Sequence, residues 1–250
     1  MAEKSVSMQK DLQVLERFLG LPVGSTSEVF EIFSELPNTI VRGESPEKFL
    51  YIEGSRKNKV LLVAHADTVW TIKKNGDIID TRKEIIREGM FIRNESGPLG
   101  VDDRAGCAIV WLLKDLGHSL LITDGEEVGR IGSDFLVHQN KDIFDRINNI
   151  HQFIIEFDRR NGNDFKCYKN AGTEEFRKYL SEKTNYTEPD TVGFTDIVTL
   201  CSKLCGVNLS IGFYNEHSED DYINIEEWLR TLNLCRNWLS EENLPRFELK

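Results

Sequence analysis

Hydrophobic residues near the start of the chain recur at intervals of three and four positions, which is typical of amphipathic helices. One set is Leu12, Leu15, Phe18 and Leu19, and a second is Val29, Ile32 and Phe33. The second set follows Ser25-Thr26-Ser27, whose hydroxyl groups are suited to capping a helix. The pattern therefore predicts two N-terminal helices.

Short apolar runs alternate with amphipathic segments along the rest of the chain. The runs predict strands at 49–52, 60–64, 120–123, 153–155 and 207–213, and the amphipathic segments predict helices at 105–116, 128–138, 174–180, 197–204 and 225–239. This alternation predicts an α/β fold of three layers, with a mixed, mostly parallel central sheet between helices. Because neither a linker nor a repeat divides the chain, we expect residues 1–250 to form one domain.

The composition is that of an ordinary globular protein, with 40% hydrophobic and 29% charged residues. The net charge of −11 disfavours nucleic acids and acidic membrane surfaces as partners. No apolar run is long enough to cross a bilayer, so we expect no membrane association. The five cysteines include no CxxC pair, which favours a reducing compartment, and we expect the cytoplasm.

In α/β folds ligands gather beyond the carboxyl ends of the strands, and the predicted strand at 60–64 is followed by His65-Ala66-Asp67. A period of two places His65 and Asp67 on the same side of an extended chain. The carboxylate can then accept a proton from one imidazole nitrogen while the other nitrogen faces a metal. The alternative interpretation of the pair is a core histidine capped by a turn aspartate.

Two further clusters each stand before a predicted helix. The adjacent carboxylates Asp102 and Asp103 are explained either by helix capping or by one aspartate bridging two cations. Glu126 and Glu127, in the segment 124–129, form either a solvated first helical turn or a pair with two different catalytic tasks. In such a pair one glutamate holds a metal and the other takes a proton from water.

Two more clusters follow the strands at 153–155 and 207–213. Asp158 stands beside Arg159 and Arg160, so an ion pair is one interpretation of this aspartate. His217 lies in a polar loop after the last predicted strand. Five separate clusters, four of them after predicted strands, thus deliver His, Asp, Glu, Asp and His in order, which are oxygen and nitrogen ligands of the kind that Zn²⁺ binds.

Between residues 65 and 217 the sequence resembles the co-catalytic di-zinc exopeptidases, which include bacterial leucyl-type aminopeptidases, peptidase T and the glutamate carboxypeptidase relatives. The resemblance rests on HAD, GVDDRAG, DGEEVG, EFD and NLSIGFYNEH in this order. It implies two Zn²⁺ ions per chain, with Mn²⁺ or Co²⁺ as substitutes. It implies that one ion is held by His65, Asp102 and Asp158 and the other by Asp102, Glu127 and His217.

The resemblance also implies that Glu126 is the general base and Asp67 the carboxylate that orients His65. Asp103 follows the bridging ligand, where the family commonly has a cis peptide bond, and Glu156 is an alternative to Asp158. In the implied mechanism a water bridging the metals loses a proton to Glu126 and attacks a peptide carbonyl. Glu126 then returns the proton to the leaving amine.

The sequence departs from many relatives between Asp158 and His217, where they insert a lid or dimerisation domain. Residues 159–216 are too few for a whole extra domain and include predicted core elements. We therefore expect a single catalytic domain without a lid, in which Tyr214 and Asn215 are candidates for the group that a lid supplies elsewhere. Thr195 and Asp196 either shape the metal-site loops or, in the case of Thr195, cap a helix.

These observations predict a two-zinc aminopeptidase or a closely related exopeptidase acting on peptides. A metal-dependent amidase or deacylase acting on a small non-peptide amide uses the same chemistry and is not separated from it by the sequence. The third interpretation is a catalytically silent homologue that binds a partner. The preferred end of the substrate and the oligomeric state are not fixed by the sequence.

Overall fold

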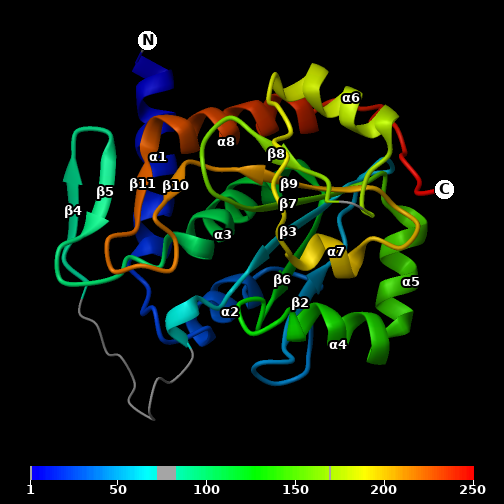
Figure 1. The fold of residues 1–250 in the computed structure, drawn as a ribbon, viewed down its shortest axis with the longest axis horizontal. Helices are drawn as coiled ribbons and strands as arrows, with labels where there is room; N and C mark the ends of the chain where they lie inside the picture. The colour runs from blue at the N-terminus through cyan, green and yellow to red at the C-terminus, as the bar shows by residue number, and fades with distance from the viewer. Residues whose placement is uncertain (1, 72–82, 169) are drawn as a thin grey trace.

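The structure is a computed structural model that describes residues 2–71, 83–168 and 170–250 (Figure 1). Within these residues seven strands form a central sheet. Their spatial order is β1 (Ile40–Arg42), β2 (Phe49–Ile52), β6 (Ser119–Thr123), β3 (Leu61–His65), β7 (Ile154–Arg159), β9 (Gly206–Ser210) and β8 (Phe165–Lys166). The four central strands β6, β3, β7 and β9 are parallel, and the strands at both edges pair antiparallel.

Helices cover both faces of this sheet, because the parallel strands are apolar on both sides. On one face lie α1 (Ala2–Leu19), α2 (Ser27–Ser34), α3 (Val101–Leu113), α6 (Glu174–Thr184) and α8 (Ile225–Leu239). On the other lie α4 (Ile131–Gln139), α5 (Lys141–Ile150) and α7 (Asp196–Leu200). In β3, Leu62 and Ala64 join the first core, and Leu61 and Val63 join the second. The predicted three-layer α/β fold is confirmed.

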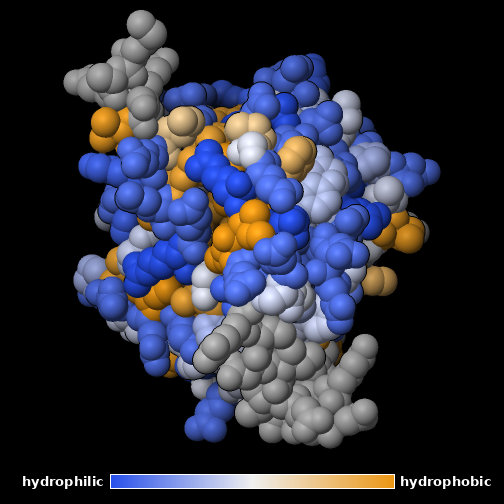
Figure 2. Space-filling view, turned by 90° about the vertical axis from the view of Figure 1, so that its left-hand side faces the viewer, coloured by the Kyte–Doolittle hydropathy of each residue, from blue (hydrophilic) through white to orange (hydrophobic). Residues whose placement is uncertain are grey.

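A second, smaller sheet was not predicted. Among the described residues it has four antiparallel strands, in the order β10 (Phe213–Tyr214), β11 (Tyr222–Asn224), β5 (Phe91–Asn94) and β4 (Ile85–Glu88). The strands are short, and apolar side chains such as Phe91 remain partly exposed, so the sequence pattern is weak. The face that carries β4 and β5 is mainly hydrophilic, with hydrophobic side chains in small separate areas (Figure 2).

Several predicted boundaries are wrong, and left-handed backbone explains two of them. The helix predicted from 128 begins at Ile131, because Gly125, Gly129 and Arg130 have positive φ angles that interrupt helical geometry. The strand predicted at 207–213 is divided into β9 and β10 at Gly212, which has a φ of 85°. The helix predicted at 197–204 is the shorter α7, and α5 was missed.

The parallel strands place their carboxyl ends along one edge of the sheet. β3 ends at His65, β6 at Thr123 and β7 at Arg159, so the segments that follow lie side by side. The loop 215–221 connects β10 and β11 of the small sheet. In the described part of the chain, no helix combines the length and hydrophobicity needed to span a membrane.

Candidate metal centre

His65 is the last residue of β3 and is fully buried. Its Nδ1 lies 3.1 Å from the backbone oxygen of Asp67 and 3.3 Å from the Asp67 carboxylate. Nδ1 therefore serves as the hydrogen-bond donor of the ring, and Nε2 is left to face the neighbouring strand ends. The Asp67 carboxylate also accepts the backbone N–H groups of Glu126 and Glu127, each at 3.1 Å. Asp67 thus positions three of the predicted site residues.

The two adjacent aspartates at the start of α3 have different surroundings. The Asp102–Asp103 peptide bond is cis, in agreement with the resemblance. The buried Asp103 carboxylate accepts the backbone N–H groups of Gly106 at 2.9 Å and His65 at 3.1 Å, so the capping interpretation applies to this residue. A Cβ atom at Gly106 would lie 2.2 Å from both Asp103 Oδ1 and the Phe157 carbonyl oxygen, so only glycine fits there.

Asp102 lies between two groups of side chains. Its Oδ1 is 3.0 Å from His65 Nε2, which is in turn 3.5 Å from Asp158 Oδ1. Its Oδ2 is 3.4 Å from His217 Nε2, which is 3.1 Å from Glu127 Oε2. The structure therefore brings the five predicted metal ligands together from β3, α3, the loop after β6, β7 and the loop 215–221.

Several atoms of this cluster are buried without a hydrogen-bond partner among the described residues. They are His65 Nε2, Asp102 Oδ1 and Glu127 Oε1. Buried polar atoms normally have a hydrogen-bond partner, so three unpartnered atoms in one cluster are unusual. Ligand atoms of these three residues lie within 4.8 Å of one another, and imidazole nitrogen with carboxylate oxygen suits Zn²⁺. The residues present therefore fit a metal centre.

The charges of the cluster lead to the same conclusion. Burial, together with the Asp102 carboxylate, raises the pKa of Asp158 to about 8. Hydrogen bonds with Asp102 and Glu127 raise the pKa of His217 to about 11. Crowded carboxylates and imidazoles of this kind hold protons at neutral pH unless cations take their place.

Glu126 lines a cavity of about 280 Å³ together with Asp102, Glu127, Asp158 and His217. Burial, with Asp158 close by, raises the pKa of Glu126 to about 10. The side chain can therefore hold a proton next to the five clustered residues. Arg160, Tyr168 and Phe194 are among its other lining residues, and no sequence signal had singled out Tyr168.

The alternative interpretation of Asp158 as the partner of a neighbouring arginine is wrong. Arg159 pairs with Asp164 at 2.8 Å, and Arg160 pairs with Glu216 at 2.7 Å. Asp158 has only 9% of its side chain exposed and faces His65.

Glu156 occupies a different environment from Asp158, although both residues belong to β7. Its buried carboxylate accepts the hydroxyl group of Thr195. Thr195 therefore does not cap α7 with its side chain. The next residue, Asp196, accepts the hydroxyl groups of Thr123 and Ser133 and so fixes the start of α7 to β6 and α4.

Tyr214 and Asn215 do not line the cavity beside the cluster. The Tyr214 hydroxyl donates to Glu227 at 2.6 Å, and its ring stacks on Tyr222. Asn215 has a φ of 55° and its amide reaches the backbone oxygen of Asp220. Neither side chain is placed to supply the group that a lid provides in other proteins.

No protein-family profile and no curated protein sequence matches this chain. Its fold is nevertheless shared with solved structures of peptidases. Aminopeptidase PepT from Bacillus cereus has a TM-score of 0.64 and 13% identity, covering 93% of this chain and 98% of that one. A tripeptidase from Staphylococcus aureus has a TM-score of 0.64 and 12% identity, with coverages of 94% and 99%.

An aminopeptidase from the archaeon Desulfurococcus kamchatkensis gives a similar result, with a TM-score of 0.63 and 13% identity over 94% of this chain and 95% of that one. Identities this low establish the fold and not the activity. The chain thus has the fold of these peptidases.

Proposed function

We propose that this protein is a metal-dependent exopeptidase, most simply an aminopeptidase, with two Zn²⁺ ions per chain. The observation that carries the proposal is the position of Asp102, whose two carboxylate oxygens face different groups of ligands. The unpartnered buried atoms of His65 and Glu127 on either side support it. Three solved structures with this fold bear the names aminopeptidase or tripeptidase.

His65, Asp102 and Asp158 would hold one cation, and Asp102, Glu127 and His217 the other. Mn²⁺ or Co²⁺ could occupy the same ligands, which offer only nitrogen and oxygen. When bound, the cations would polarise the substrate carbonyl and acidify water.

The remaining chemistry belongs to the chain itself. Glu126 acts as the general base, taking a proton from the attacking water and delivering it to the leaving amine nitrogen. Its position in the cavity wall beside Asp102 and Glu127 supports this role. Asp67 keeps His65 Nδ1 as the donor and, through two backbone hydrogen bonds, holds Glu126 and Glu127 at the cavity.

The cavity itself favours a short substrate. Its volume is about 280 Å³, Phe194 and Tyr168 form apolar parts of its wall, and the ion-paired Arg160 and Glu216 line it as well. The segment 159–216 contains the strands β8, β9 and β10 and the helices α6 and α7, which pack on the central sheet. This is in keeping with a single catalytic domain without an inserted lid. The cytoplasm remains the proposed compartment, because the five cysteines, all among the described residues, are unpaired.

A panel of aminoacyl, N-acyl and C-terminal dipeptide substrates, assayed with zinc analysis of the same preparation, tests this proposal. Two zinc ions and cleavage of aminoacyl substrates are the expected result. Cleavage of N-acyl substrates alone would favour an amidase or deacylase. No bound metal and no hydrolysis would favour a protein that only binds a partner.

A further inference from the structure

The loop 215–221 carries His217, and two of its residues have energetically unfavourable backbone conformations. Asn215 has a φ of 55° and His217 a φ of 64°, both in the left-handed region. Residues other than glycine adopt this region at a cost and need support from their surroundings. The His217 side chain is also 49% exposed, so packing around the ring gives little of that support.

Asp221, four residues after His217, supplies a buried connection. Only 3% of this residue is exposed. One carboxylate oxygen accepts the backbone N–H of Leu99 at 2.6 Å, and the other accepts that of Val101 at 3.0 Å. Val101 directly precedes Asp102, so a single carboxylate joins the loop of one proposed ligand to the segment of another.

The segment that receives Asp221 is itself well fixed. Lys83 donates from Nζ to the Leu99 carbonyl oxygen at 2.8 Å and to the Leu19 carbonyl oxygen at 2.6 Å. Gly100 has a φ of 67°, and a Cβ atom there would lie 2.9 Å from Val23 Cγ1. Asp221 therefore connects the His217 loop to a rigid part of the molecule.

Other contacts of the loop are weaker candidates for this task. The ion pair between Glu216 and Arg160 has 58% of the arginine side chain exposed, and exposed pairs of this kind contribute little. Ser218 donates to the Asn215 carbonyl oxygen within the same loop, which cannot position the loop as a whole. Two charge-assisted hydrogen bonds accepted by a buried carboxylate are the stronger restraint.

We propose that Asp221 is a positioning residue that holds His217 against Asp102 and Glu127, and thereby sets the affinity of the second cation site. The inference rests on the proposed function, because it assumes that these three residues bind a cation. Asp221 touches neither cation nor substrate and acts only through the backbone of residues 99–101 and the loop that carries His217.

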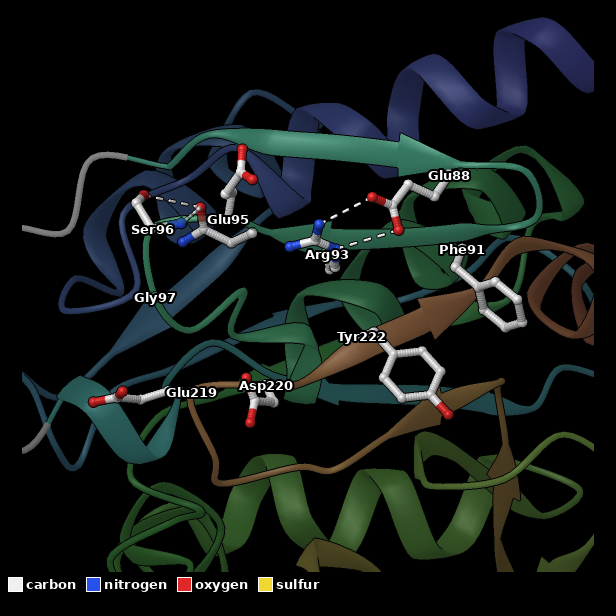
Figure 3. A pocket seen from close by; sticks show the side chains of 10 residues that line it. Glu88, Phe91, Arg93, Glu95, Ser96, Gly97, Glu219, Asp220 and Tyr222 are labelled. Carbon is white, nitrogen blue, oxygen red and sulfur yellow. Dashed lines mark hydrogen bonds and ion pairs between the residues drawn. The ribbon is translucent and has the colours of Figure 1, made fainter.

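The chain offers a matched control in the preceding residue. The side chain of Asp220 lines a cavity of about 600 Å³ beside β5 and β11 (Figure 3). D220N removes the same charge from the same loop without touching residues 99–101. Any effect of D221N that D220N lacks therefore arises from the buried carboxylate with its two hydrogen bonds and not from the net charge of the loop.

The test is calorimetric titration of the metal-free protein, residues 1–250, with Zn²⁺ alone. The amide of D221N can accept only one of the two N–H groups, so we expect the site formed by Asp102, Glu127 and His217 to lose about 10- to 100-fold in affinity, with the other site unchanged. D220N should match the wild type. D221E keeps the charge but displaces the acceptors by one methylene group. We expect D221E to weaken the same site, and D221E replaces D221N in the test if D221N does not fold.

A background variant separates positioning from general damage. In H217A the second site has lost its imidazole, so adding D221N should cause no further loss of affinity if Asp221 acts through His217. If both Zn²⁺ affinities of D221N and of D221E equal those of the wild type, the inference is overturned while the proposed function stands. A wild-type protein that binds fewer than two Zn²⁺ ions would instead overturn the proposed function and, with it, this inference.

Discussion

Adjacent residues of the same type take different positions at the candidate metal centre. Glu126 and Glu127 both donate their backbone N–H groups to Asp67, yet Glu127 Oε2 lies 3.1 Å from His217. Glu126 lines the cavity and makes no such contact among the described residues. One glutamate is therefore placed as a ligand, and the other is free to exchange a proton.

This difference predicts the behaviour of E126Q. Because the amide cannot accept the proton of water, we expect turnover to fall by about 10²–10⁴-fold while both zinc ions are retained. Zinc analysis and steady-state kinetics on the same sample measure the two effects. The matched variant E127Q should lose zinc as well as activity. Near-normal turnover of E126Q would remove Glu126 from its proposed role.

At the scale of elements, β7 shows what a sequence pattern leaves open. Glu156 and Asp158 are two positions apart on one strand, so alternation places them on the same side and does not choose between them. The choice depends on α7, which lies far along the chain and brings the Thr195 hydroxyl to Glu156. Asp158 is left facing His65.

Substitution of the two acidic residues of β7 tests this assignment. We expect D158A to lower zinc content sharply, because one cation would lose a ligand. E156A should retain zinc, because Glu156 contacts Thr195 instead of the cluster. Atomic absorption on both purified variants gives the comparison. Equal zinc loss in the two variants would contradict the assignment.

The elements also show how far the sequence predicts the fold. The long periodic segment Ile225–Leu239 predicted α8 with its observed bounds. The short apolar run Phe49–Ile52 likewise predicted the bounds of β2. The small sheet was missed because its strands are only two to four residues long, too short for a periodic pattern to be recognised. The order of strand ends predicted which residues meet, whereas the hydrogen bonds of Asp196 and Asp221 join distant segments that no local pattern reveals.

At the scale of the whole molecule, the net charge of −11 includes five carboxylates, Asp67, Asp102, Glu126, Glu127 and Asp158, that the fold gathers at one edge of the sheet. Their mutual repulsion opposes folding unless protons or cations compensate it. A ligand that binds only the folded state at 100 times its dissociation constant adds about 2.7 kcal/mol to the free energy of unfolding. Two bound cations should therefore stabilise the protein noticeably.

The stabilisation should depend on pH in a definite direction. Burial raises the pKa values of Asp158 to about 8 and of Glu126 to about 10 in the folded protein. A carboxyl group whose pKa is higher in the folded than in the unfolded protein stabilises the fold in acid. This contribution is lost as the pH climbs from the pKa of the unfolded state to that of the folded state. The metal-free protein is thus weakened by these two carboxylates from about pH 4 upward, while metal binding tightens as its ligands deprotonate.

We therefore expect the rise in Tm on adding Zn²⁺ to the chelator-treated protein to be larger at about pH 7.5 than at about pH 5.5. Circular dichroism melts with and without Zn²⁺ at the two pH values measure this difference. A rise that is equal at both values, or larger in acid, would show that the clustered carboxylates are not the groups that bind the metal.

We propose that Asp102 and the four side chains around it form a two-cation centre that hydrolyses peptides. The most direct test of this proposal is to measure zinc content and aminoacyl-peptide hydrolysis on one preparation during chelation and stepwise return of Zn²⁺. We expect hydrolysis to be lost on chelation and to return fully at two equivalents per chain. Hydrolysis that persists in the metal-free protein, or a protein that takes up no zinc, would contradict it.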